Sequence, residues 1–145
     1  MTRKNVCTLI AIASLVAPAV VLATLPAPGQ PEVYLDYDAG TFAVVWDPVD
    51  GATKYSVEVE GIVAYGDPSS PSEAPVQLSF STTEAELDLT LAGFAAAVAD
   101  QLGVAADDLI SATGSIKVKA MNPGKGAGRQ NNPFSEPVSG TLFLQ

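Results

Sequence analysis

The sequence predicts an all-β fold, a two-sheet β-sandwich with one short α-helix inserted before the sixth strand. Apolar and polar residues alternate with a period of two in about seven short segments, and turn-forming residues separate these segments. One segment instead has apolar residues at spacings of three and four, which is typical of a helix. Many short strands at such spacing indicate a sandwich of immunoglobulin-like type.

The expected strands alternate between an inward and an outward face. The clearest is 54–60, where Tyr55, Val57 and Val59 share one face. The full set comprises residues 32–37, 41–46, 54–60, 76–81, 85–91, 115–121 and 134–144. Pro137 in the last of these cannot donate to a ladder, so we expect an edge strand or a bulge there.

The expected helix spans residues 91–103. Its apolar face comprises Leu91, Phe94, Ala95, Val98 and Leu102. Thr90 is suited to cap its start and Gly103 to end it. A membrane-surface helix needs basic residues on its polar face, and this one has none, so we expect it to pack across one end of the sheets.

Turn-forming residues predict two loops and one short turn. Residues 66–75, "GDPSSPSEAP", are predicted to form a loop, and so are residues 122–133, "NPGKGAGRQNNP", which we expect to be mobile. A short helical turn is expected at 105–110.

The first residues are typical of an export signal. A basic start, an apolar stretch and small residues before a cut after Ala23 predict a cleaved signal peptide at 1–23. The alternative is a retained membrane anchor, since the stretch is close to the ~20 residues that span a bilayer. Residues 24–31 then form a Pro-rich linker and residues 32–145 one domain. Either alternative places the domain outside the cytoplasm, secreted, periplasmic or at the cell surface.

Composition excludes several kinds of chemistry. The chain has no histidine, and its one cysteine, Cys7, precedes the apolar stretch and would leave with it. Triads that need histidine and zinc sites of the usual ligands therefore cannot form, and no cofactor is expected. The net charge of −9 becomes −11 when Arg3 and Lys4 are removed with the signal, which excludes nucleic acid as a partner.

Two segments resemble those of a known family. "WDPVDGATKYSVEVEG" resembles the second and third strands of fibronectin type III domains, and "SIKVKAMNPG" with "NPFSEPVSGTL" resembles the last two. The helix at 91–103, followed by "LG" and "KVKA", is similar to the amino-terminal domain of SusE-type outer-membrane proteins of starch-utilisation systems. SusE-type proteins are lipoproteins with further carbohydrate-binding domains, and this chain lacks both features. The resemblance therefore implies a spacer-like module more than starch binding.

The aromatic residues divide between core and candidate surface. Trp46 shares strand parity with Phe42 and Val44, so we assign it to the core rather than to a glycan platform. Tyr34, Tyr37, Tyr65 and Phe134 lie near strand ends or loops. The candidate binding residues are Tyr65 and Phe134, with Asn131 and Asn132 beside the latter.

The pairs of acidic residues do not indicate a functional site. Neither Asp36 with Asp38 nor Asp107 with Asp108 matches a calcium loop, so no metal site is predicted. Glu58 and Glu60 are expected to oppose Lys117 and Lys119, because the third and sixth strands are neighbours in this fold.

The expected function is therefore non-catalytic. The sequence favours an exported adhesion, spacer or assembly module that contacts a protein or another copy of itself. The alternative is a cell-surface binder of starch-like polysaccharide of SusE type. An enzyme is the weakest hypothesis, because no pair of carboxylates is expected to face a cleft.

Overall fold

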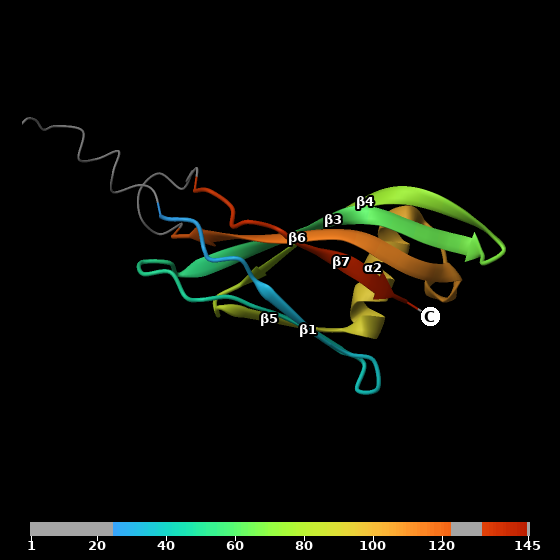
Figure 1. The fold of residues 1–145 in the computed structure, drawn as a ribbon, viewed down its shortest axis with the longest axis horizontal. Helices are drawn as coiled ribbons and strands as arrows, with labels where there is room; N and C mark the ends of the chain where they lie inside the picture. The colour runs from blue at the N-terminus through green and yellow to red at the C-terminus, as the bar shows by residue number, and fades with distance from the viewer. Residues whose placement is uncertain (1–24, 123–131, 145) are drawn as a thin grey trace, which may run out of the picture.

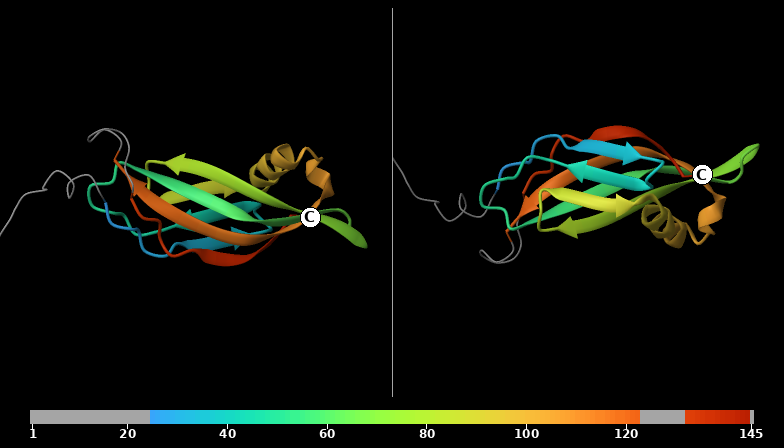
Figure 2. Two further views of the ribbon diagram at one scale, coloured as in Figure 1. Left: turned by 90° about the horizontal axis from the view of Figure 1, so that it is seen from above. Right: turned by 90° about the horizontal axis from the view of Figure 1, so that it is seen from below.

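The computed structural model describes residues 25–122 and 132–144, which form two packed sheets (Figures 1 and 2). The first sheet has the order β1-β2-β5, with bounds Glu32–Asp36, Thr41–Val45 and Glu86–Thr90. The second has the order β4-β3-β6-β7, with bounds Ser70–Thr82, Lys54–Asp67, Leu109–Met121 and Val138–Phe143. The helix α2 spans Leu91–Leu102, and a 3₁₀ turn, η1, spans Ala106–Asp108.

This topology confirms the predicted fold class, an immunoglobulin-like sandwich of the fibronectin type III kind. The strands within each sheet pair in the antiparallel sense, and the helix precedes β6. β3 and β6 are neighbours, with Glu58 directly opposite Lys117 as predicted. Glu60 instead faces Ser115, and Lys119 faces Ser56, so only one of the expected acid–base pairs is in register.

The predicted loop at 66–75 is wrong. β3 runs on to Asp67, β4 begins at Ser70, and the two form a hairpin with a two-residue loop. The Asp67 carboxylate accepts hydrogen bonds from the Ser69 backbone N–H (3.0 Å) and hydroxyl (2.8 Å), which lower the pKa of Asp67. Pro71 and Pro75 are tolerated in β4 because β4 is an edge strand.

The strands of the second sheet are also longer than predicted. β6 begins at Leu109 rather than 115, because it continues to pair with the extended β3 across an irregularity at Ala64 and Tyr65. The short turn expected at 105–110 is confirmed as η1. The edge position expected around Pro137 is confirmed, since β7 starts one residue later and ends its sheet.

The helix ends as predicted. The Thr90 hydroxyl accepts from Gly93 N–H at 2.9 Å, and Gly103 closes the helix with φ of 71°. α2 covers the side of the sandwich formed by β4 and β5 (Figure 2). Its Phe94 ring stacks on the Phe42 ring of β2, with ring centroids 5.5 Å apart. The opposite side, between β1 and β7, has no covering helix in the part of the chain that the structure describes.

Trp46 and Tyr55 lie in the core, which confirms their assignment. Trp46 is 5% exposed and Tyr55 4%, and their rings meet edge to face at 5.3 Å. The Tyr55 hydroxyl accepts from Val49 N–H at 2.9 Å. The Trp46 indole N–H, by contrast, has no partner among the described residues. This tryptophan therefore stabilises the core through its packing, while its unpaired N–H destabilises it.

Other sequence predictions lie outside the described residues. These are the signal peptide or anchor at 1–23, Cys7, Asn131 and most of the loop at 122–133. In the ranges that the structure does describe, no helix has the length and hydropathy of a membrane span.

Candidate functional site at the edges of β1 and β7

Three exposed aromatic rings lie along the β1 and β7 edges. Tyr34, Tyr37 and Phe143 are 57%, 49% and 59% exposed. The Tyr37 hydroxyl accepts a hydrogen bond from the Phe143 backbone N–H at 3.0 Å, which joins the turn after β1 to the end of β7. Leu35 adds an exposed apolar side chain on β1. Aromatic rings exposed in this way are enriched at binding surfaces.

Carboxylates border these rings. The Tyr34 hydroxyl donates to Glu32 at 2.6 Å, and this bond, together with the negative charge of Glu32, raises the pKa of Tyr34. Asp36 accepts from Ala39 N–H at 3.0 Å and so shapes the turn. Across residues 25–122 and 132–144, no three metal-binding side chains gather closely enough to hold an ion. The aromatic edge is thus acidic.

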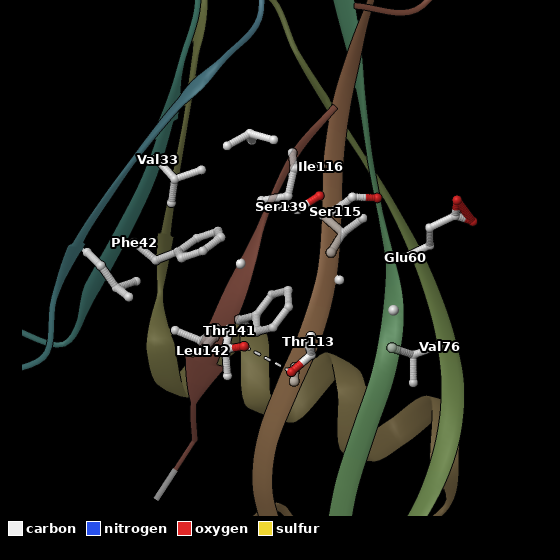
Figure 3. Close-up of a pocket in the computed structure, with 18 residues that line it drawn as sticks. Val33, Phe42, Glu60, Val76, Thr113, Ser115, Ile116, Ser139, Thr141 and Leu142 are labelled. Carbon is white, nitrogen blue, oxygen red and sulfur yellow. Dashed lines mark hydrogen bonds between the residues drawn. The ribbon is translucent and has the colours of Figure 1, made fainter. Parts of the chain in front are cut away.

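A cavity of about 130 Å³ lies between the sheets behind this edge (Figure 3). Its floor is a row of three glycines, since Gly61 pairs with Gly114 and Gly114 with Gly140. All three fall on the inward face of their strands, where other residues place apolar side chains. The facing wall is Val33, Leu35 and Phe42 from the first sheet. The remaining apolar lining residues are Val59, Val76, Phe94, Ala112, Ile116, Val138 and Leu142.

Two of the glycines are required by the backbone. A Cβ on Gly61 would lie 2.7 Å from the Cα of Gly114 and closer still to the Thr113 carbonyl oxygen. A Cβ on Gly114 would overlap the Glu60 carbonyl oxygen in the same way. Gly140 differs, because a Cβ there would meet nothing within 4 Å. The close approach of β3 and β6 explains the first two glycines, while Gly140 leaves the cavity open without being sterically required.

The β4 and β7 edges of the second sheet are not equally available. On β4, Gln101 of α2 occupies the edge at Gln77: its amide oxygen accepts from Gln77 N–H and its amide nitrogen donates to Gln77 O, both at 2.7 Å. On β7, the described residues place hydrogen-bonding side chains only at the two ends of this edge. Gln30 donates to Pro137 O at 2.9 Å, and Tyr37 accepts from Phe143 N–H. Between these two contacts, Ser139, Gly140 and Thr141 of β7 are exposed to solvent.

The residues predicted from the sequence lie elsewhere. Tyr65 is half-buried and packs against the core. Phe134 is half-buried beneath two ammonium groups, with Lys117 Nζ 4.3 Å and Lys119 Nζ 5.0 Å from its ring centroid. These lysines therefore stack on an aromatic ring of their own chain.

Asn132 is interior rather than exposed. It is 5% exposed, accepts from Leu25 N–H at 2.9 Å and donates to Ala120 O at 2.7 Å. Through these two hydrogen bonds, the Asn132 side chain connects the segment before β1 to the end of β6. The structure thus does not bring Tyr65, Phe134 and Asn132, the described members of the predicted set, into one site.

Sequence reasoning missed Leu35, Phe143 and the glycine row. The signal for the glycines was partial, because only Gly140 lies within an expected strand, whereas Gly61 and Gly114 lie one residue beyond the strands expected at 54–60 and 115–121 and continue their inward parity. What the sequence could not show is that the three positions are opposite one another. Tyr37 was noted as near a strand end, but its contact with Phe143 joins residues 106 positions apart.

The solved structures that are similar to this chain are distant from it. No family model and no curated protein matches the chain. A solved structure described as "FN3tt mut" has 14% identity and a TM-score of 0.35, covering 81% of this chain and 96% of that one. The fn3 domain of human collagen alpha-1(XX) chain has 16% identity and a TM-score of 0.39, covering 82% and 84%. The fold assignment above rests on the strand order itself.

Proposed function

We propose that this chain is an exported, non-catalytic module that makes protein–protein contacts at the cell surface through the β1 and β7 edges. The observation that carries the proposal is the aromatic edge, where Tyr37 and Phe143 lie exposed beside an open strand edge. The basic and apolar segment at 1–23 supports export. An acidic surface suits a soluble domain outside the cytoplasm.

The titratable groups support a non-catalytic role. Among the described residues, those with shifted pKa values are Tyr34, Asp67 and Glu86, which lie on three different strands at exposed positions. Each shift has a local cause in a neighbouring carboxylate or serine. An active site would instead bring perturbed groups together in a cleft.

Site-specific photocrosslinking in the native cells tests the contact. A benzophenone amino acid replaces Phe143 in the full chain, and a matched chain carries it at Thr83, which is exposed in the bend before β5. We expect adducts with a second protein from position 143 and few from position 83. Equal labelling from both positions, or none from 143, would contradict a protein contact at this edge. Protease treatment of intact cells checks export, because an exported domain is digested without lysis.

A glycan-binding function is the second candidate. Tyr37 is exposed and stands between Asp36 and Asp38, an arrangement that suits stacking on a sugar ring with carboxylates at its hydroxyl groups. Binding of starch-like oligosaccharides on a glycan array, lost on Tyr37→Ala, would support it. Loss on Tyr65→Ala or Phe134→Ala instead would favour the residues predicted from the sequence. An array without signal would exclude starch-like ligands.

A further inference from the structure

We propose that the open edge of β7 accepts an extended peptide of a partner protein as an additional strand, and that one apolar side chain of this peptide enters the cavity over Gly140. The proposal rests on the protein-contact function above and names the chemistry of the partner. It combines two features, the free backbone groups of β7 and the cavity behind them.

The backbone of β7 offers donors and acceptors to such a peptide. In an antiparallel ladder, alternate residues point their N–H and C=O groups toward opposite neighbours. Leu144 N–H donates to Ile110 O of β6, whereas Phe143 N–H points away to Tyr37. Ser139 and Thr141 have the same parity as Phe143, so their N–H and C=O groups face the open edge. Within residues 25–122 and 132–144, no backbone partner is found for them.

The same register sends one side chain inward. Residues opposite each other in neighbouring strands place their side chains on the same face of the sheet. A peptide residue opposite Gly140 would therefore point between the sheets, where Gly140 has no side chain and a Cβ meets nothing within 4 Å. The cavity of about 130 Å³ is close to the ~150 Å³ apolar cavity that accepts benzene in another protein. A leucine, isoleucine or phenylalanine side chain fits this space.

A second copy of the chain is the less suitable occupant. Two β7 edges paired symmetrically about Gly140 would place glycine opposite glycine and leave both cavities empty. Pro137 of each copy would also interrupt the ladder. Charge favours the same conclusion, because the chain carries a net charge of −9 and the carboxylates of Glu32 and Asp36 lie on β1 beside this edge. The structure therefore favours a basic or neutral peptide with one central apolar residue.

Titration of the ¹⁵N-labelled full chain with a synthetic peptide tests the proposal. The probe is acetyl-Thr-Thr-Lys-Leu-Lys-Thr-Thr-amide, and its matched control carries Gly in place of Leu. We expect the Leu peptide to bind at least tenfold more tightly, because only it fills the cavity. The largest chemical-shift changes should fall on the amides of Ser139 and Thr141. Equal affinity of the two peptides, shifts centred elsewhere, or no binding would overturn the proposal.

Two variants test the contributions of the cavity and of the β7 edge independently. Gly140→Ile fills the cavity from within, and Ser139→Pro removes a donor that faces away from β6, so neither removes a bond of the β6–β7 ladder. Both should weaken the Leu peptide at least tenfold while the thermal midpoint stays near that of the parent. Unchanged affinity in both variants would refute the proposed mode. If crosslinks from position 143 persisted in cells that carry Gly140→Ile, the protein contact would be made in another way. If the parent chain gave no crosslinks from position 143, the proposed function itself would be refuted.

Discussion

Replacement of Gly114 by alanine tests the close approach of β3 and β6. The added Cβ would lie 2.7 Å from the Cα of Gly61 and nearer still to the Glu60 carbonyl oxygen, whereas ordinary contact begins at 3.4 Å. Both clashing atoms belong to the backbone, so no side chain can move aside. The two strands must separate locally, in the middle of a ladder that pairs Lys54–Tyr65 with Leu109–Met121.

The cost follows from two terms. Overpacking costs about 1–3 kcal/mol. Separation of the strands also weakens the ladder hydrogen bonds beside the pair, each worth about 1 kcal/mol net. We therefore expect Gly114→Ala to lower the free energy of unfolding by about 2–5 kcal/mol, a large share of the ~5–15 kcal/mol of a typical domain. At about 4 °C per kcal/mol, the thermal midpoint should fall by roughly 8–20 °C.

Gly140→Ala is the matched control, since it makes the same change in the same row of residues. Its Cβ meets nothing within 4 Å, so its unfolding free energy should stay within about 1 kcal/mol of the parent. Urea unfolding followed by Trp46 fluorescence measures both variants. Equal unfolding free energies for the two variants would refute the close approach, and with it the β3–β6 geometry that forms the cavity floor.

Three further changes give sharp outcomes. Trp46→Phe should lower the free energy of unfolding by about 1 kcal/mol, much less than the ~3–5 kcal/mol of Trp46→Ala, because the smaller ring also removes a buried N–H without a partner. Urea unfolding followed by circular dichroism measures both variants, and a larger loss for phenylalanine than for alanine would contradict this reasoning. Thr90→Ala should cost about 1 kcal/mol of unfolding free energy and Thr90→Ser far less, and equal losses would show that the hydroxyl does not cap α2. A hydrogen bond to Asp88 and the negative charge of Asp88 raise the pKa of Glu86, so protonation of Glu86 stabilises the folded state. This stabilisation is present below pH 4.5 and is lost as the pH rises through the raised pKa. Glu86→Gln should therefore raise the thermal midpoint at pH 7 but not at pH 3, and a shift of equal size at both pH values would exclude this electrostatic origin.

The fold was largely predictable because its signals are local. Period-two alternation around Tyr55 and Val57 identified β3, and the spacing of Phe94 and Val98 identified α2. The loop predicted at 66–75 failed for a physical reason. Prolines and serines are typical of loops, yet an edge strand tolerates them, and the sequence does not state which strands are at the edge.

The candidate site was much less predictable. The contact of Phe143 with Tyr37 and the burial of Asn132 depend on segments more than 100 residues apart. The cavity depends on three glycines becoming neighbours across three strands, which requires the register of β3, β6 and β7. Local patterns carry no information on register across long loops.

Amide hydrogen exchange of the β7 residues tests the central claim most directly, namely that the middle of this edge is open and accepts a strand. In the free full chain, Gly140 and Leu142 should exchange slowly, because their N–H groups point to β6, while Ser139 and Thr141 exchange rapidly. Saturation with the Leu peptide should slow Ser139 and Thr141 and leave the other two unchanged. Slow exchange of Ser139 and Thr141 in the free chain, or no slowing with the peptide bound, would contradict the account.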